Sequence, residues 1–349
     1  MITVKEIAKM CNVSPSTVSN IVNGKTNVSE ETRQRVLDVI KETGYRPNYF
    51  ASSMRKQNTK LISVVVEDLD QFSTTPIVEA AMEYCEKHGY RTILVNLRMY
   101  DKWKDTWFHD ESKLESVLIP ALNEVQSIKV DGVIYVAGHC RNIRCFPKDF
   151  PLPLMVAYAT NEGNRFPSVI LDDEKGGYDM MKYLISMGHR KIGIMAGAPD
   201  NIHTVSRLLG CQKALQEEGI PYNSGLTVFG GWEEKTGYTC AEKLAQTGVT
   251  AIWCMNDLMA GGAYEFAHKN GIEIGRDLSI AGYDNRQISE FMYPRLTTNA
   301  LPLREIGAIS AQTMLTMLAD GRDAVNTEPV PVPCTLMIRD SVKEPASTL

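Results

Sequence analysis

The sequence predicts an all-α helix-turn-helix headpiece followed by an α/β core of two lobes built on parallel sheets. Three observations support this fold class. Capped helical patterns fill the first sixty residues, apolar and amphipathic patterns alternate after them, and the net charge changes sign between the two parts. With 349 residues, the chain is long enough for two or three compact units. We expect the headpiece over residues 1–46, a hinge helix and linker over 47–58, and the core over 59–349.

The headpiece pattern predicts three short helices. Side chains suited to capping a helix start stand at Thr3, Ser14 and Ser29. Pro15 follows at the first position of the second helix, where its missing N–H group costs nothing. Gly44 can end the third helix in a left-handed conformation. A tight turn between the first two helices makes this a helix-turn-helix unit.

The core pattern predicts parallel sheets, because continuous apolar strands alternate with amphipathic helices. The expected strands are residues 61–66, 92–96, 132–137, 154–158, 169–171, 191–196, 226–229, 251–255 and 278–282. The clearest expected helices are residues 77–88, 177–187, 206–218 and 258–269. A loop-rich stretch at 159–167 divides the strands into two sets. We therefore expect lobes at about 59–160 and 165–290, a further crossing near the C-terminus, and a cleft between the lobes.

The charge distribution separates one part of the chain from the rest. The net charge of −5 by itself argues against a nucleic-acid partner. Residues 1–60, however, carry a net charge of +5, so the remaining residues carry −10. Only the first sixty residues are expected to be attracted to phosphate.

Cysteine usage and hydropathy indicate a cytoplasmic protein with no membrane partner. The eight cysteines are scattered, and the spacing of Cys140 and Cys145 favours reduced thiols over a metal site, so no metal or cofactor is expected. Polar Lys5 and Glu6 interrupt any signal peptide at the N-terminus. No apolar run reaches the roughly 18 residues that span a bilayer.

The sequence offers no constellation for catalysis, so an enzyme is not expected. His109 and His139 lack a serine, cysteine or carboxylate partner at a recognisable spacing. Small polar side chains at 13–20 begin the second helix instead, where a helix end can enter a major groove. Taken alone, that stretch is equally compatible with an ordinary capped surface helix.

The run VKEIAKMCNVSPSTVSNIVNGKTNVSEETRQRVLDVIKETGYRPNYFASSMR closely resembles the headpiece of the LacI family of bacterial repressors. The resemblance continues through VDGVI, GGYDMMKYLISMGHRKIGIMAG, MNDLMA, IAGYDN and TLMIRDS, so it covers nearly the whole chain. It implies a DNA-binding transcription regulator, a repressor, with a periplasmic-binding-protein-like sensor core. It also implies a homodimer on a roughly palindromic double-stranded operator, and a small-molecule effector that either releases the DNA or strengthens its grip.

The resemblance implies DNA contacts from the headpiece. Residues at the positions of Pro15, Ser16 and Asn20 face the major groove in the family, and an asparagine can pair with adenine. The full implied set is Ser14, Pro15, Ser16, Thr17, Asn20, Asn23, Arg33, Met54 and Arg55.

Two other kinds of DNA contact belong to this set. Residues at the positions of Thr17, Asn23 and Arg33 usually touch phosphate, which gives affinity rather than specificity. Met54 occupies the position of a leucine that wedges into the minor groove from the hinge helix, and a wedge of this kind kinks the duplex. The alternative for Met54 is packing against the core.

The resemblance also implies an effector site between the lobes. Its residues are Phe72, Arg207, Trp232, Asn256 and Asp284. An aromatic face with polar side chains around it suits a sugar or sugar derivative. Two of the polar residues have an alternative role, because Asp284 can cap a turn and Asn256 can cap the next helix. Trp232 can instead fill a lobe surface.

Two segments depart from the family pattern. Residues 70–75 replace an Asn-Pro-Phe-Phe-like segment, and only Phe72 can inherit its aromatic role. Residues 100–111 crowd four aromatic side chains among charges, and this segment could roof the cleft or extend a dimer contact. A solute-binding protein and an α/β enzyme with an accessory domain are the rival functions, and the basic headpiece opposes the first.

Overall fold

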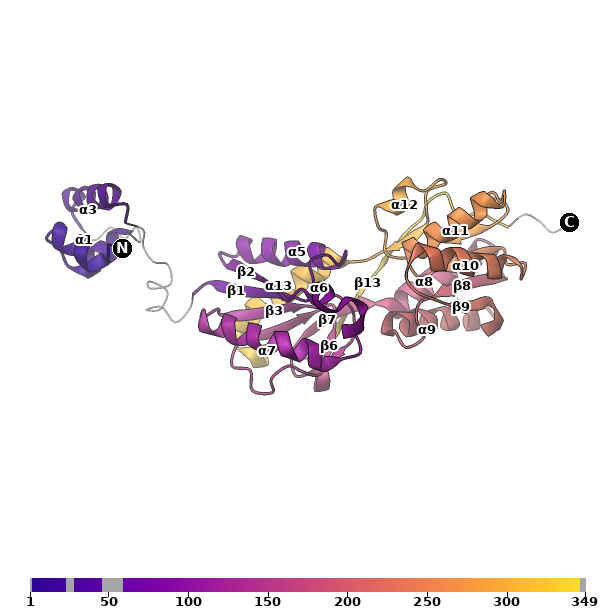
Figure 1. Ribbon diagram of the computed structural model, residues 1–349, viewed down its shortest axis with the longest axis horizontal. Helices are drawn as coiled ribbons and strands as arrows, with labels where there is room; N and C mark the ends of the chain where they lie inside the picture. Colours follow the sequence, from indigo (N-terminus) through magenta and orange to yellow (C-terminus); the bar gives the residue numbers. More distant parts are fainter. Residues whose placement is uncertain (1, 23–27, 46–58, 346–349) are drawn as a thin grey trace. The chain divides into compact units, whose positions relative to one another are not determined.

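The computed structural model describes residues 2–22, 28–45 and 59–345 (Figure 1). The chain divides into two compact units, Met1–Lys60 and Leu61–Leu349. Each unit is described by itself. The expected hinge helix lies outside the described residues, and so do the sequence-based expectations for Asn23, Met54 and Arg55.

The N-terminal unit contains the three expected helices, α1 (Val4–Met10), α2 (Pro15–Val22) and α3 (Glu30–Thr43). Thr3 and Glu6 form the predicted capping box, and the Ser29 side chain accepts a hydrogen bond from the N–H of Thr32. Gly44 ends α3 with φ of 63°. The buried apolar side chains of the unit are Ile7, Ala8, Cys11, Val18, Ile21 and Val36. Their helical spacing explains why this short sequence forms a core.

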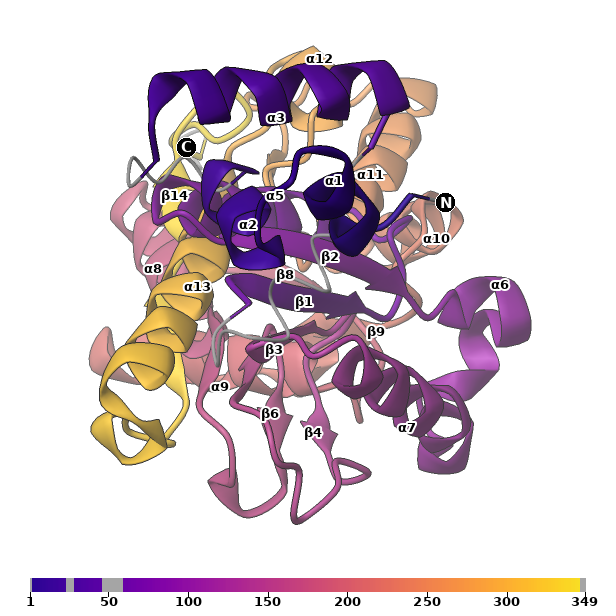
Figure 2. The same ribbon diagram turned by 90° about the vertical axis from the view of Figure 1, so that its left-hand side faces the viewer.

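The first lobe of the larger unit is built on a parallel sheet of six strands in the order β13-β7-β5-β3-β1-β2. The strands are β1 (Leu61–Val66), β2 (Arg91–Asn96), β3 (Gly132–Val136), β5 (Leu154–Ala157), β7 (Ser168–Asp172) and β13 (Val330–Pro333). Helices α5 (Thr74–Lys87) and α13 (Leu303–Asp320) pack on one face, and α7 (Glu111–Ser127) packs on the other (Figure 2). A short parallel pair, β4 (Asn142–Ile143) and β6 (Thr160–Asn161), lies beside the sheet. Burial on both faces explains the continuous apolar strands.

The second lobe has a parallel sheet of four strands in the order β11-β10-β8-β9. The strands are β8 (Ile192–Ala196), β9 (Thr227–Phe229), β10 (Ala251–Cys254) and β11 (Ser279–Ala281). Helices α8 (Asp173–Ser186) and α9 (Ile202–Glu217) cover one face, and α10 (Glu234–Ala245) and α11 (Asp257–Lys269) cover the other. Among the described residues, no helix is both long enough and apolar enough to cross a membrane.

The sheet topology corrects the expected boundary between the lobes. The predicted strand at 169–171 pairs with β5, so it belongs to the first sheet and not to the second lobe. The loop-rich stretch at 159–167 is an excursion of the first lobe, and the chain first crosses at Asp172 and Asp173. The chain later returns through β12 (Thr298–Ala300) to α13, and leaves again through β14 (Thr335–Met337), which pairs antiparallel with β12. Strands this short and polar give no clear sequence pattern.

Candidate functional site

The first turn of α2 presents a cluster of hydroxyl groups to solvent. The Ser14 hydroxyl accepts a hydrogen bond from the N–H of Thr17 at 3.1 Å and lies 2.6 Å from the hydroxyl of Ser16. Ser14, Pro15 and Ser16 are exposed, and Asn20 is half-buried one turn further on. Because Val18 and Ile21 on the opposite face fill the core, the polar face of α2 is free to meet a partner.

Arg33 stands in the first turn of α3 and is half-buried. It forms no ion pair with any carboxylate of the described residues. This leaves its guanidinium available to an anion such as a phosphate. The described residues therefore bring hydroxyl, amide and guanidinium groups to the surface of one small helical unit.

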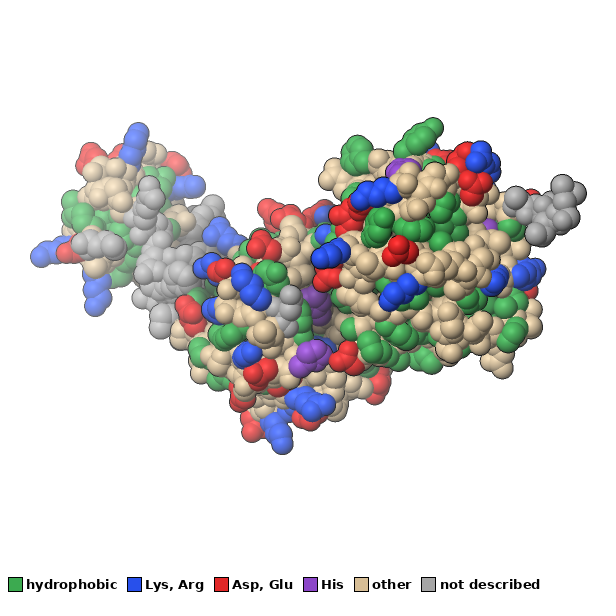
Figure 3. All heavy atoms as spheres, turned by 45° about the vertical axis from the view of Figure 1, so that its right-hand side comes forward, with side chains coloured by type: hydrophobic (Ala, Val, Ile, Leu, Met, Phe, Trp, Pro, Cys, Tyr) green, Lys and Arg blue, Asp and Glu red, His purple; other side chains and the backbone are tan. Residues whose placement is uncertain are grey.

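The larger unit is hollowed between its lobes, and Figure 3 shows histidine side chains in this hollow, while others lie elsewhere on the second lobe. Contacts across the lobes surround it. The Cys140 N–H of the first lobe donates to Nε2 of His203 in the second lobe at 3.4 Å. The guanidinium of Arg286 in the second lobe lies 4.5 Å from the ring centroid of Phe72 in the first. These contacts depend on the angle between the lobes.

Arg207, one of the expected effector residues, is bound by the protein itself. Only 3% of its surface is exposed. Its Nε donates to a carboxylate oxygen of Asp173 at 2.8 Å, its Nη1 donates to the carbonyl of Met255, and its guanidinium lies 3.7 Å from the ring centroid of Tyr283. The guanidinium of Arg207 therefore makes most of its contacts with groups inside the second lobe.

Asp173 and His203 complete a buried polar network that sequence reasoning missed. Nδ1 of His203 lies 2.5 Å from the second carboxylate oxygen of Asp173. Burial alone would raise the pKa of Asp173, but the charges and hydrogen bonds of Arg207 and His203 hold it well below its usual range. The only sequence signal was the Asp172–Asp173 pair between a strand and a helix, which is also an ordinary helix start.

Asn256 and Trp232 lie next to this network. The Asn256 side chain accepts from the N–H of Met259 at 2.7 Å and donates to the carbonyl of Trp232 at 2.9 Å. The alternative of a helix cap is thus confirmed for Asn256, and its amide is used within the lobe. The Trp232 ring covers Gly197, where even a Cβ atom would be too close to it.

Phe72 and Asp284 come together at a pocket of about 580 Å³. The first lobe contributes Phe72 and Pro76, the loop after β11 contributes residues 284–287, and the approach to α13 contributes residues 300–305. Asp284 has a φ of 105° and is half-buried. Burial raises the pKa of its carboxyl well above the usual range.

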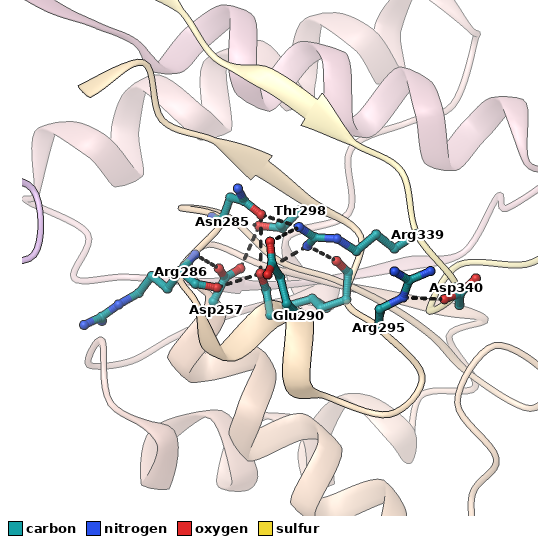
Figure 4. Close-up of polar contacts among 10 residues, drawn as sticks. Asp257, Asn285, Arg286, Glu290, Arg295, Thr298, Arg339 and Asp340 are labelled. Atoms are coloured by element: carbon teal, nitrogen blue, oxygen red, sulfur yellow. Dashed lines mark hydrogen bonds and ion pairs between the residues drawn. The ribbon is translucent and has the colours of Figure 1, made fainter. Parts of the chain in front are cut away.

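The loop that carries Asp284 is held rigidly from both sides (Figure 4). Asp257, at the start of α11, accepts the backbone N–H of Arg286 at 2.6 Å and the hydroxyl of Thr298 at 2.6 Å. Arg339 donates to the side chain of Asn285 at 2.7 Å. Because these partners lie on three separate elements, the loop is positioned before any ligand arrives.

The aromatic segment at 100–111 forms a wall of the first lobe. It folds as α6 (Met99–Trp103) and a short 3₁₀ helix (Lys104–Trp107), and Trp107 is buried in the core. The guanidinium of Arg141 lies 4.8 Å from the Trp107 ring centroid and is paired with the buried Glu67. Phe108 meets His139 edge to face at 4.3 Å, next to Cys140 at the lobe junction. Burial lowers the pKa of His139 to about 3.

The described residues show neither a metal site nor a disulfide. Within the part of the chain that the structure describes, no group of three or more His, Cys, Asp or Glu side chains is arranged to hold a metal ion. All eight cysteines lie in that part, and each is a free thiol.

A two-lobed α/β core with an interlobe pocket, linked to a small helix-turn-helix unit, is the architecture of a DNA-binding regulator that senses a small molecule. Residues 3–48 match the family described as bacterial regulatory proteins, lacI family, and residues 181–342 match the periplasmic binding protein-like domain. The chain is 32% identical over 348 residues to the HTH-type transcriptional repressor PurR of Mannheimia succiniciproducens, covering 99% of each chain. The chain therefore belongs to the lacI family of bacterial regulatory proteins.

Other relatives agree with this assignment. The chain is 30% identical over 346 residues to catabolite control protein A of Priestia megaterium, covering 98% of this chain and 99% of the relative. The solved Lac repressor dimer bound to operator and the anti-inducer ONPF has the same fold, with a TM-score of 0.77 and 23% identity over 98% of this chain and 99% of that one. The predicted family and fold class are thus confirmed.

Proposed function

We propose that this regulator acts as a homodimeric repressor on a roughly palindromic operator, and that a sugar-like molecule bound between the core lobes controls its affinity for DNA. The observation that carries the proposal is the pocket of about 580 Å³ where Phe72 of one lobe meets Asp284 and Arg286 of the other. A ligand there touches both lobes at once. Because its target is DNA, the protein is proposed to act in the cytoplasm, and its free thiols suit a reducing compartment.

The proposed DNA interface is the exposed face of α2. Pro15, Ser16 and Asn20 would approach base edges in the major groove, where an asparagine amide can bind adenine through two hydrogen bonds. Ser14, Thr17 and Arg33 would contact phosphates and fix the position of the helix. Asn23, Met54 and Arg55 keep the roles that the resemblance implies for them.

The proposed coupling runs through the lobe junction. A ligand in the pocket changes the angle between the lobes and so competes with contacts such as that between His203 and Cys140. The hinge segments of the two protomers would respond to this change, with a coupling of typically about 1–3 kcal/mol. Phe72 offers a face for a sugar ring, while Asp284 and Gln287 offer polar groups for hydroxyls.

DNA selection by the full chain tests this function. A randomised palindromic library is enriched on the purified protein, and the selected duplex is titrated by fluorescence anisotropy at several salt concentrations. We expect nanomolar binding that weakens steeply with salt, because phosphate contacts release counterions. A chain that begins at residue 58 is the control, and retained binding by this shortened chain would refute the assignment of the headpiece.

A further inference from the structure

Arg286 lines the pocket with a guanidinium that forms no ion pair and no hydrogen bond with the described residues. Its backbone N–H is held by Asp257, so its position is fixed, while its side chain extends away from that cluster in Figure 4. The guanidinium lies 4.5 Å from the Phe72 ring centroid and lines the pocket. Among the described residues, no carboxylate forms an ion pair with it and no side-chain or carbonyl acceptor forms a hydrogen bond with it.

The neighbouring arginines are all occupied. Arg207 is paired with Asp173 inside the second lobe. Arg304, on the pocket wall, pairs with Glu83 at 2.6 Å. Arg339 donates to Asn285 at 2.7 Å and to the carbonyl of Leu296 at 2.8 Å. Arg286 thus differs from them in offering its full set of donors to a molecule in the pocket.

The surroundings of Arg286 suit a negatively charged group. A guanidinium that stacks on an aromatic face keeps its edge free to bind a phosphate or carboxylate through two parallel hydrogen bonds. Asp284 stands two residues away, and burial raises the pKa of its carboxyl, which reduces the repulsion of an incoming anion. The remaining wall includes apolar Pro76, Leu301 and Pro302, and one further carboxylate, that of Glu305 in the first turn of α13.

We infer that the effector of the proposed function is a small sugar-like molecule carrying an anionic group, a phosphate or a carboxylate, and that Arg286 binds this group against the ring of Phe72. The two side chains belong to opposite lobes. An anion held by Arg286 therefore acts at the lobe junction, where it can change the contact between Arg286 and Phe72. A neutral sugar would lack this interaction.

Matched ligand pairs test the inference on the full chain. Thermal unfolding is measured with ribose and ribose 5-phosphate, and with glucose, glucose 6-phosphate and gluconate. We expect at least one anionic member to raise the Tm more than its neutral counterpart, because a ligand that binds only the folded state stabilises it. The Kd of that member, measured by calorimetry, should weaken at least tenfold in Arg286→Gln and less in Arg286→Lys, which keeps the charge.

Arg276→Gln is the matched control, because Arg276 is exposed and pairs with Asp277 away from the pocket. It should leave the Kd unchanged. The inference is overturned if no anionic member stabilises the chain more than its neutral counterpart, or if Arg286→Gln binds that member with the wild-type Kd. These readouts need no DNA, so a failure here is separate from a failure of the proposed operator binding.

Discussion

Replacing Asp173 by alanine should destabilise the core, because it leaves the buried guanidinium of Arg207 without its carboxylate partner. Asp173 and Arg207 are 5% and 3% exposed, and removing one partner of a buried ion pair typically lowers the free energy of unfolding by about 3–5 kcal/mol. Arg207 would keep its hydrogen bond to Met255 and its contact with the Tyr283 ring. We therefore expect the free energy of unfolding of Asp173→Ala to fall by an amount at the lower end of this range, about 3 kcal/mol.

Urea denaturation of the purified chain, followed by the fluorescence of the buried Trp107 and Trp253, measures this loss. Glu265→Ala is the control, because Glu265 forms only an exposed pair with Lys269 one helical turn away, and it should change the free energy of unfolding by less than about 0.5 kcal/mol. The double variant Asp173→Ala with Arg207→Met should lose less free energy of unfolding than the two single variants lose together. The reason is that the apolar methionine leaves no unpaired buried charge.

The same pair predicts a pH dependence. Because the pKa of Asp173 is lower in the folded chain than in the unfolded chain, its carboxylate stabilises the fold at neutral pH. This contribution is lost as the pH falls below the unfolded value of about 4. Two results would show that Asp173 and Arg207 are not coupled in this way. One is a loss of less than about 1 kcal/mol in the free energy of unfolding of Asp173→Ala at pH 7, and the other is a variant whose stability falls with acid as steeply as that of the wild type.

Three further changes test other parts of the molecule. Asn20→Ala should weaken operator binding by about 1–3 kcal/mol and relax the preference for the base pair that Asn20 contacts. An equal loss of affinity on every DNA sequence would show that Asn20 does not read a base. Met54→Ala should weaken operator binding and reduce DNA bending in a gel assay, whereas unchanged affinity would end the wedge hypothesis. Because burial lowers the pKa of His139 to about 3, wild-type stability should fall as the pH drops below about 6.5, and His139→Gln should flatten that slope in acid unfolding.

Much of the fold was predictable because its signals are local. Capping residues such as Thr3 and Ser29 act within one helical turn, so they mark helix starts in any context. Strands such as Leu61–Val66 and Ala251–Cys254 are buried on both faces, so their residues form continuous apolar runs in the sequence. The resemblance to a known family then joined these elements into one architecture.

The pocket was less predictable because its contacts join residues far apart in the chain. Arg207 and Asn256 have the right residue types, yet their polar groups bind Asp173, Met255 and Met259 inside the protein. Nothing local distinguishes such an arginine from Arg286, whose guanidinium stacks on Phe72 but forms no ion pair or hydrogen bond with the described residues. Only the three-dimensional arrangement shows which of them can meet a ligand.

The sequence by itself determined the helix-turn-helix unit, the parallel α/β core and the family, because helical periodicity, strand burial and end caps depend on near neighbours. The tertiary structure alone decided where the lobes divide, since the pairing of β7 with β5 assigns residues 168–172 to the first sheet. It also decided that Phe72, Asp284 and Arg286 share one pocket. Their meeting depends on crossings between two lobes, and no local pattern along the chain records that geometry.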